Sequence, residues 1–230
     1  MIQALSPPVP QIKSASETAR LRVTEVFFSL QGETSRVGLP TVFVRLTGCP
    51  LRCGYCDTEY AFHGGKVMAV AAILAEVASY GTRYVTVTGG EPLAQKECAV
   101  LLTSLCEADY SVSLETSGAM DIAGVDPRVA KILDIKTPGS DEVQRNRWAN
   151  LSFLTPRDEV KFVLCDERDY RWAIEVMEEH RLDRTCSILL SPVHGKLDPA
   201  LLGNWILRDR LPVRMQVQLH KLLWGERRVR

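Results

Sequence analysis

The sequence has no excess charge of either sign and no long apolar stretch. Lys+Arg and Asp+Glu both number 28, so the basic excess typical of nucleic-acid-binding domains is missing. No apolar run approaches the ~20 residues that cross a bilayer, and the N-terminus lacks the charged start and long apolar run of a secretory signal. We therefore expect a cytoplasmic protein with reduced thiols, and neither a membrane nor nucleic acid as a direct partner.

The seven cysteines do not fit a disulfide framework, which needs an even set and an oxidising compartment. Three of them stand together as Cys49, Cys53 and Cys56, with the spacing C-x3-C-x2-C and no fourth cysteine near. Thiolates hold iron–sulfur clusters, and three thiolates leave one corner of a four-iron cube without a protein ligand. An open iron can bind a small molecule and pass it an electron, so the spacing predicts cluster chemistry.

A structural zinc site is the alternative for this triplet, because such sites take four Cys or His ligands. His63 follows Cys56 by seven residues and could complete a Cys3His set. A zinc-binding interaction module therefore stays open on spacing alone.

Short β-branched runs alternate with helical patterns along the chain, which favours an α/β fold with a mostly parallel sheet. The links between residues 115 and 132 and between 136 and 160 are short of full helices, and an eight-unit barrel typically needs ~250 residues. We predict a partial (open) β/α barrel of about six parallel strands with trimmed helices, forming one domain over residues 21–230. Residues 1–20, polar and proline-rich, are expected to be a flexible lead-in. The predicted strands are 23–29, 41–46, 84–88, 112–115, 132–135, 160–164, 188–190 and 213–219, and the predicted helices are 70–80, 95–108, 166–180 and 199–209.

Polar motifs follow several of the predicted strands, where parallel α/β folds bind their ligands. One of them is Gly-Gly-Glu-Pro over residues 89–92, directly after a strand. Two glycines allow close approach of the backbone to a ligand. A plain strand-to-helix turn without a ligand is the alternative.

The two motifs together resemble the radical S-adenosylmethionine (SAM) enzymes, with aromatic Tyr55 just before the last cysteine of the triplet. The resemblance implies a [4Fe-4S] cluster whose open iron is chelated by the amino and carboxylate groups of SAM. It also implies reductive cleavage of SAM to a 5′-deoxyadenosyl radical that abstracts hydrogen, with the protein supplying the positioning.

A narrower resemblance is to the 7-carboxy-7-deazaguanine synthases. It rests on Phe28-Ser29-Leu30-Gln31-Gly32-Glu33, Arg45, Cys56-Asp57-Thr58, Glu115-Thr116-Ser117-Gly118 and Gln218-Leu219-His220-Lys221. It implies a carbon–nitrogen lyase of queuosine and 7-deazapurine biosynthesis that converts 6-carboxy-5,6,7,8-tetrahydropterin to 7-carboxy-7-deazaguanine with loss of ammonia. Hydrogen abstraction at C6, ring contraction and return of the hydrogen to regenerate SAM are implied as well. So are a Mg2+ ion at the substrate, a flavodoxin- or ferredoxin-type electron donor and a homodimer.

By the same resemblance, the site residues divide into three groups, and the radical itself is carried by the cofactor. Predicted substrate contacts are Leu30, Gln31, Gly32, Glu33, Arg45 and Thr88. Predicted SAM contacts are Tyr55, Asp57, Gly90, Glu91, Ser117, Lys136 and Ser191. Predicted metal ligands are Cys49, Cys53 and Cys56 for the cluster and Thr58 for Mg2+.

The chemistry of individual side chains fits these roles. The Arg45 guanidinium can pair two-pronged with a carboxylate, with a surface ion pair as the alternative. Gln31 and Glu33 offer donors and acceptors for the amide-like edge of a pterin. Thr58 has a hard oxygen acceptable to Mg2+, and a turn hydroxyl bonded to the backbone is the alternative.

Two features depart from the family pattern. Thr34 stands where many members have glycine, and the chain continues past Lys221. A glycyl-radical activating enzyme, which shares the cluster motif but acts on a protein partner, is the rival within the superfamily; Gln31, Glu33 and Arg45 speak against it.

Overall fold

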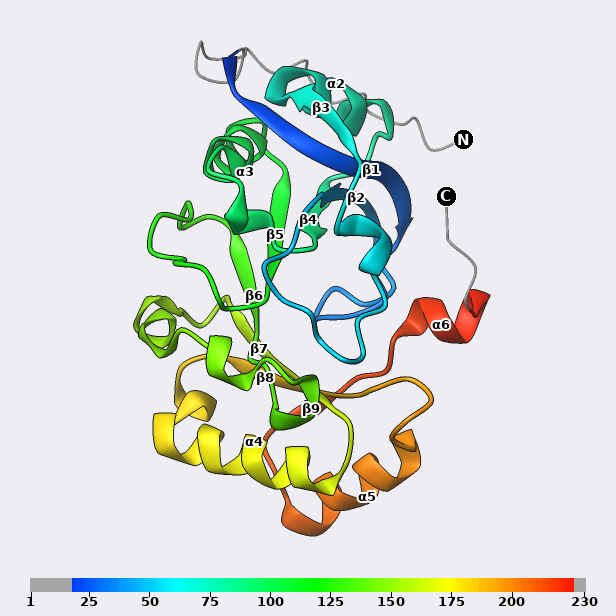
Figure 1. Ribbon diagram of the computed structural model, residues 1–230, viewed down its shortest axis with the longest axis vertical. Coiled ribbons are helices and arrows are strands. Elements are labelled where there is room, and N and C mark those ends of the chain that lie inside the picture. Colours follow the sequence, from blue (N-terminus) through cyan, green and yellow to red (C-terminus); the bar gives the residue numbers. More distant parts are fainter. Residues whose placement is uncertain (1–17, 226–230) are drawn as a thin grey trace.

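A single nine-stranded sheet organises the computed structural model, which describes residues 18–225 (Figure 1). The lead-in predicted over residues 1–20 lies outside the described residues apart from its last three. Along the sheet the strands run β3-β1-β2-β4-β5-β6-β7-β8-β9. Their bounds are β1 (Arg20–Leu30), β2 (Pro40–Leu46), β3 (Lys66–Ala69), β4 (Tyr84–Gly89), β5 (Ser111–Thr116), β6 (Ala130–Asp134), β7 (Glu159–Leu164), β8 (Ser187–Pro192) and β9 (Arg214–Met215).

The sheet is open, because β3 and β9 are its two edges. From β2 to β9 every pairing is parallel, whereas β1 pairs antiparallel with both β2 and β3. The predicted open barrel of about six parallel strands is confirmed: β2 and β4 to β8 are parallel, and the last predicted strand is present as the two-residue β9. Strand β3 was missed.

The main helices cover the sheet in two groups: Figure 1 shows α2 and α3 at one end of the molecule and α4 and α5 at the other. Their bounds are α2 (Val70–Ser79), α3 (Cys98–Glu107), α4 (Glu167–His180), α5 (Pro199–Asp209) and α6 (Leu219–Trp224). Asp166 and Asp198 cap α4 and α5 by accepting hydrogen bonds from backbone N–H groups. Residues 117–129 form no helix, and only short 3-10 turns lie between β6 and β7, as the predicted trimming requires.

The two faces of the sheet differ in polarity. In β4, Val85 and Val87 are fully buried in the apolar core shared with the helices. Thr86 and Thr88 alternate with them and bond Ser113 and Glu115 on the next strand. We call this second side the polar face; it comprises Arg45, Thr86, Thr88, Ser113, Glu115, Asp134 and Lys161.

Two elements are shorter than predicted. In each, a glutamine at the predicted helix or strand bonds to a residue far away in the sequence. The helix predicted over 95–108 begins at Cys98, because Gln95 is extended and bonds both backbone groups of Arg22 and the Thr47 carbonyl. The strand predicted over 213–219 is only Arg214–Met215, because Gln216 turns to accept a hydrogen bond from Thr34 N. Helix α6 was missed. Within residues 18–225, no helix combines the length and apolarity needed to span a membrane.

Candidate active site

The cysteine loop, residues 47–62, follows β2 and carries the three thiols of the triplet. Cys49, Cys53 and Cys56 are free and half-buried. Burial raises the pKa of all three thiols, that of Cys53 to about 11. Metal ligation requires thiolates, so these thiols release their protons when they bind iron, and the metal offsets the cost of the buried charge.

The zinc alternative required His63 beside the three thiols. Across residues 18–225, no three His, Cys, Asp or Glu side chains are grouped around a position for one metal ion. His63, the fourth ligand of the zinc alternative, is exposed. A four-iron cluster is ligated at separate corners and needs no such convergence.

At the Gly-Gly-Glu-Pro motif, the end of β4 packs closely against the cysteine loop. A Cβ atom on Gly90 would collide with the Gly48 carbonyl oxygen and lie 2.8 Å from Cys49 Cβ. The amide nitrogen of Glu91 donates to the same Gly48 oxygen at 2.9 Å. The glycines therefore serve close packing against the loop, and the half-exposed Gly90 keeps backbone accessible beside the cysteines.

Glu91, a predicted SAM contact, is fully buried, with 0% exposure. Its carboxylate accepts hydrogen bonds from Leu93 N (3.0 Å), Thr116 Oγ1 (2.9 Å), Ser117 N (2.7 Å) and Ser117 Oγ. These bonds tie the ends of β4 and β5 together and also occupy the hydroxyl of Ser117.

The Gln31-Gly32-Glu33 motif reaches the polar face from the amino ends of the parallel strands, whereas the cysteine loop lies at their carboxyl ends. Strand β1 is antiparallel, so its end lies beside the amino ends of the parallel strands, where the neighbouring Ser35 N donates to Glu159 Oε1 (3.0 Å). Gln31, 2% exposed, donates from Nε2 to Thr86 Oγ1 (3.2 Å) and Glu115 Oε1 (3.3 Å). Sequence reasoning placed the motifs at the carboxyl ends and did not anticipate this approach.

Lys161 is a site residue that the sequence reasoning missed. Its Nζ lies 2.8 Å from Glu33 Oε2 and 3.5 Å from Asp134 Oδ2. Burial works against its charge, but Glu33, Asp134 and Glu115 outweigh that effect and raise the pKa of Lys161 well above its usual value. The available signal was a lysine amid the apolar residues of a strand, Val160-Lys161-Phe162.

Arg45 lies on the polar face next to Thr88, its register partner on β4. It is 16% exposed at the side chain, and its Nε donates to Glu25 Oε1 at 2.8 Å. The guanidinium also lies over the rings of Phe27 and Tyr60, at 5.6 and 5.8 Å from their centroids. Arg45 thus forms an ion pair with the partly exposed Glu25, as the alternative had it, but through Nε, and within residues 18–225 no hydrogen bond is recorded for its Nη groups.

Thr88, predicted to contact the substrate, also belongs to the polar face. Its hydroxyl donates to Glu115 Oε2 at 2.8 Å. A hydroxyl that donates one bond still has lone pairs to accept another.

The predicted SAM contacts Tyr55 and Lys136 come together at the ends of the strands. Lys136 Nζ pairs with Asp134 Oδ2 at 3.1 Å, and the charges of both residues act on the Tyr55 phenol. Tyr55 OH and Asp134 Oδ1 are buried, and neither has a hydrogen-bond partner among the described residues. Two unsatisfied polar atoms fit a polar ligand between the cysteine loop and β6.

Of the remaining predicted site residues, Asp57 and Thr58 belong to the cysteine loop. Asp57 Oδ1 accepts from Thr58 Oγ1 at 2.8 Å, so the Thr58 hydroxyl donates to a side chain and not to the backbone as the turn alternative had it. Ser191 is buried near the end of β8.

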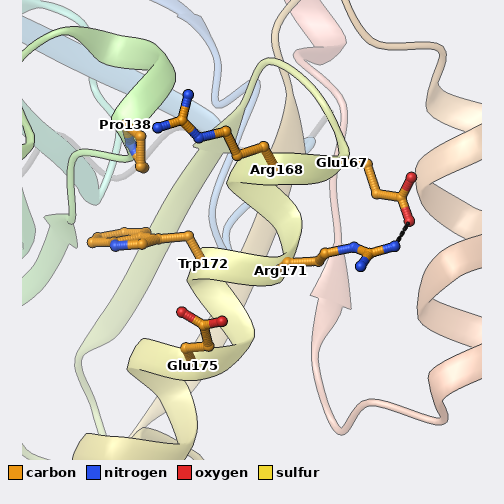
Figure 2. Close-up of a pocket in the computed structure, with 6 residues that line it drawn as sticks. All are labelled: Pro138, Glu167, Arg168, Arg171, Trp172 and Glu175. Atoms are coloured by element: carbon orange, nitrogen blue, oxygen red, sulfur yellow. Dashed lines mark hydrogen bonds and ion pairs between the residues drawn. The ribbon is translucent and has the colours of Figure 1, made fainter.

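A separate hollow of about 460 Å³ lies along α4 (Figure 2). Its lining residues are Pro138, Glu167, Arg168, Arg171, Trp172 and Glu175. Arg171 pairs with Glu167 at 2.8 Å, and the two arginines and two glutamates balance. None of the predicted site residues lines it, so it is not the active site.

Comparisons with known proteins agree with this geometry. The sequence pattern of the radical SAM superfamily matches residues 43–195. The 7-carboxy-7-deazaguanine synthase of Chlorobaculum tepidum is 46% identical over 213 residues, which cover 91% of this chain and 97% of that protein. This chain belongs to the 7-carboxy-7-deazaguanine synthase family. The synthase of Koribacter versatilis is 42% identical over 219 residues, covering 89% of this chain and 97% of that protein.

Solved structures agree on the fold of the 7-carboxy-7-deazaguanine synthase family. The crystal structure of QueE from Escherichia coli matches with a TM-score of 0.72 at 23% identity, over 86% of this chain and 94% of that chain. Streptococcus suis SuiB bound to S-adenosylmethionine matches with a TM-score of 0.53 at 14% identity, over 74% of this chain and 45% of that chain. Membership of the radical SAM superfamily brings a [4Fe-4S] cluster and SAM as the cofactors, which the three thiols and the two unsatisfied polar atoms fit.

Proposed function

We propose that this protein converts 6-carboxy-5,6,7,8-tetrahydropterin to 7-carboxy-7-deazaguanine, with loss of ammonia. The observation that carries the proposal is the match, over nine-tenths of the chain, to relatives that bear this name. The polar face supports it independently, because it brings together the Arg45 guanidinium, bonded through Nε to Glu25, and the part-buried pair of the Gln31 amide and the Glu115 carboxyl. These groups suit a small heterocycle that carries a carboxylate.

Cys49, Cys53 and Cys56 hold the cluster, and Gly90, Tyr55, Asp57 and Lys136 surround SAM. When bound, the cluster and SAM would supply the radical that removes hydrogen from C6 of the pterin. The chain's own task is placement. Glu91 keeps the β4 end against the cysteine loop, which fixes the distance between the cofactor and the polar face.

On the substrate side, Arg45 pairs with the carboxylate of the pterin through its Nη groups. Glu33 accepts hydrogen bonds from the amide-like edge of the ring. Lys161 holds its Oε2 and Gln218 holds its Oε1. Gln31 and Thr88 complete the polar surroundings, both bonded to Glu115. Burial raises the pKa of Glu115 despite the nearby Lys161, so this carboxyl holds a proton more tightly than an ordinary glutamate.

Further parts of the proposal follow from the resemblance and from single side chains. Thr58 gives Mg2+ an oxygen ligand beside the substrate, and Leu30, Gly32, Ser117 and Ser191 complete the contacts. A flavodoxin- or ferredoxin-type protein delivers the electron, the active form is a homodimer, and the protein works in the cytoplasm.

The test is a reaction of the anaerobically reconstituted, reduced protein with carboxytetrahydropterin and SAM. We expect 7-carboxy-7-deazaguanine and ammonia in equal amounts, with SAM neither consumed nor cleaved in proportion to product. Absence of the deazaguanine from a protein that still cleaves SAM would reject the substrate assignment. Stoichiometric zinc without iron or sulfide would reject the enzyme altogether.

A further inference from the structure

The C-terminal segment, residues 214–225, leaves the sheet at β9 and reaches the loop that follows β1. Figure 1 shows it running from β9 to α6, at the right of the view. Gln216 N donates to Leu190 O at 3.0 Å, and Leu219 N donates to Gly32 O at 3.0 Å. The segment is thus fastened to β8 at one point and to the Gln31–Glu33 motif at another.

Gln218 lies between these two points and contacts two loops at once. Its Nε2 lies 2.9 Å from Glu33 Oε1 and 3.2 Å from Asp57 Oδ2. An amide nitrogen has two N–H groups, so one can be donated to each carboxylate. Glu33 is a predicted substrate contact, whereas Asp57 belongs to the cysteine loop and is a predicted SAM contact.

Gln218 is hydrogen-bonded to both carboxylates, and the charge of Lys161, which pairs with Glu33 at 2.8 Å, also acts on Asp57. Asp57 is held within its own loop by Thr58. The Gln218 amide is a direct hydrogen-bonded link between the loop that receives the pterin and the loop that receives the cofactor. Ordering either loop orders the amide, and the amide then restrains the other loop.

We propose that Gln218 is a positioning residue that couples the binding of SAM to the binding of the pterin. This inference rests on the proposed function for the identity of the two ligands. By linkage, each ligand then raises the affinity for the other by the same factor. The segment acts without touching the reacting atoms.

The first experiment follows amide hydrogen exchange of the cluster-loaded protein with and without SAM, and uses no pterin. In the wild type we expect SAM to slow exchange in the peptide covering residues 31–36 by about three-fold. In Gln218→Met, whose side chain keeps its length but cannot donate, we expect no such change there, while protection of the cysteine loop by SAM persists.

The matched control is Gln216→Met, which loosens the same segment from Thr34 N but leaves the contacts of Gln218 to both carboxylates. It should retain the SAM-dependent protection of residues 31–36. Three results would overturn the proposal. SAM could still protect residues 31–36 in Gln218→Met, it could fail to protect them in the wild type, or both variants could lose the protection equally.

The second experiment measures the dissociation constant of SAM with and without saturating carboxytetrahydropterin. We expect a ratio of about five to ten in the wild type, which falls to about one in Gln218→Met. A merely structural role would weaken both ligands and leave the ratio unchanged, which would count against coupling. A wild type that binds SAM but not the pterin would reject the proposed function, and the exchange experiment would still decide the role of Gln218.

Discussion

The cysteine loop lies at the carboxyl ends of the parallel strands and the loop over residues 31–36 at their amino ends, and the two loops are built differently. The cysteine loop holds three half-buried thiols of raised pKa and a phenol that has no hydrogen-bond partner among the described residues. In residues 31–36, by contrast, Gln31, Glu33, Ser35 and Arg36 all have partners on strands β4 to β7. The substrate side is thus preorganised by the protein, whereas the cofactor side depends on the group that it holds.

The largest effect should come from removing one thiol. Cys53→Ala should leave the cluster without one of its three ligands, so bound iron and SAM cleavage should fall to background, because no neighbouring group can replace the thiolate. Iron and sulfide analysis after anaerobic reconstitution measures this. Cys106→Ala, a cysteine of α3 outside the triplet, is the control and should keep its iron. A full cluster in the Cys53 variant would remove the distinction between the two loops.

The next largest effect should come from Arg45 on the polar face, the proposed partner of the pterin carboxylate. Arg45→Ala should weaken pterin binding about 100-fold, the value of a two-pronged charge-assisted pair of roughly 3 kcal/mol. Affinity for SAM should change little. Arg45→Lys keeps the charge without the fork and should fall between the two. Titration of each ligand checks this, and an equal loss of both affinities would contradict the assigned role.

A smaller effect concerns the pH dependence of stability on the substrate side. Burial raises the pKa of Glu115 in the folded protein, so the folded state binds this proton more tightly than the unfolded state. Stability is therefore lost as pH rises from the ordinary carboxyl range through the raised pKa. Glu115→Gln should remove this loss, so the free energy of unfolding of the variant should fall less than that of the wild type as pH rises above the ordinary carboxyl range.

Urea unfolding at several pH values compares Glu115→Gln with the wild type. The exposed Glu178→Gln on α4 is the control and should follow the wild-type profile. Parallel profiles for wild type and Glu115→Gln would mean that burial of this carboxyl has no cost.

The smallest effect should come from Thr34, at the turn of the substrate loop. Its φ is +68°, a left-handed conformation that disfavours a β-branched residue. Thr34→Gly should relieve this strain, and the lost bond from Arg36 N to the threonine hydroxyl (3.1 Å) offsets part of the gain. We expect about 0.5 kcal/mol of added stability in urea unfolding. Ser35→Gly, at a neighbour without positive φ, should destabilise instead, and the same sign for both would refute the explanation.

Much of the cofactor side could be predicted from the linear sequence, because its parts are local. The spacing of Cys49, Cys53 and Cys56 lies within eight residues, and Gly89–Pro92 directly follows a strand whose alternation is plain. Helices α4 and α5 could likewise be predicted from the sequence, because an aspartate cap precedes each of them. Such signals need no knowledge of distant contacts.

The substrate side was decided by the tertiary structure, because its bonds join residues far apart in the chain. Lys161 and Gln218 reach Glu33 across 128 and 185 residues, and their own neighbours in sequence give no reason for either contact. The antiparallel direction of β1 brings Gln31 to the amino ends of the parallel strands, whereas the other motifs lie at the carboxyl ends, and only the fold shows that Glu91 is buried and bonded to the end of β5. Local sequence motifs were enough to predict the chemistry. Only the folded sheet determined which side chains share one face and which are buried, because these depend on contacts between residues far apart in the chain.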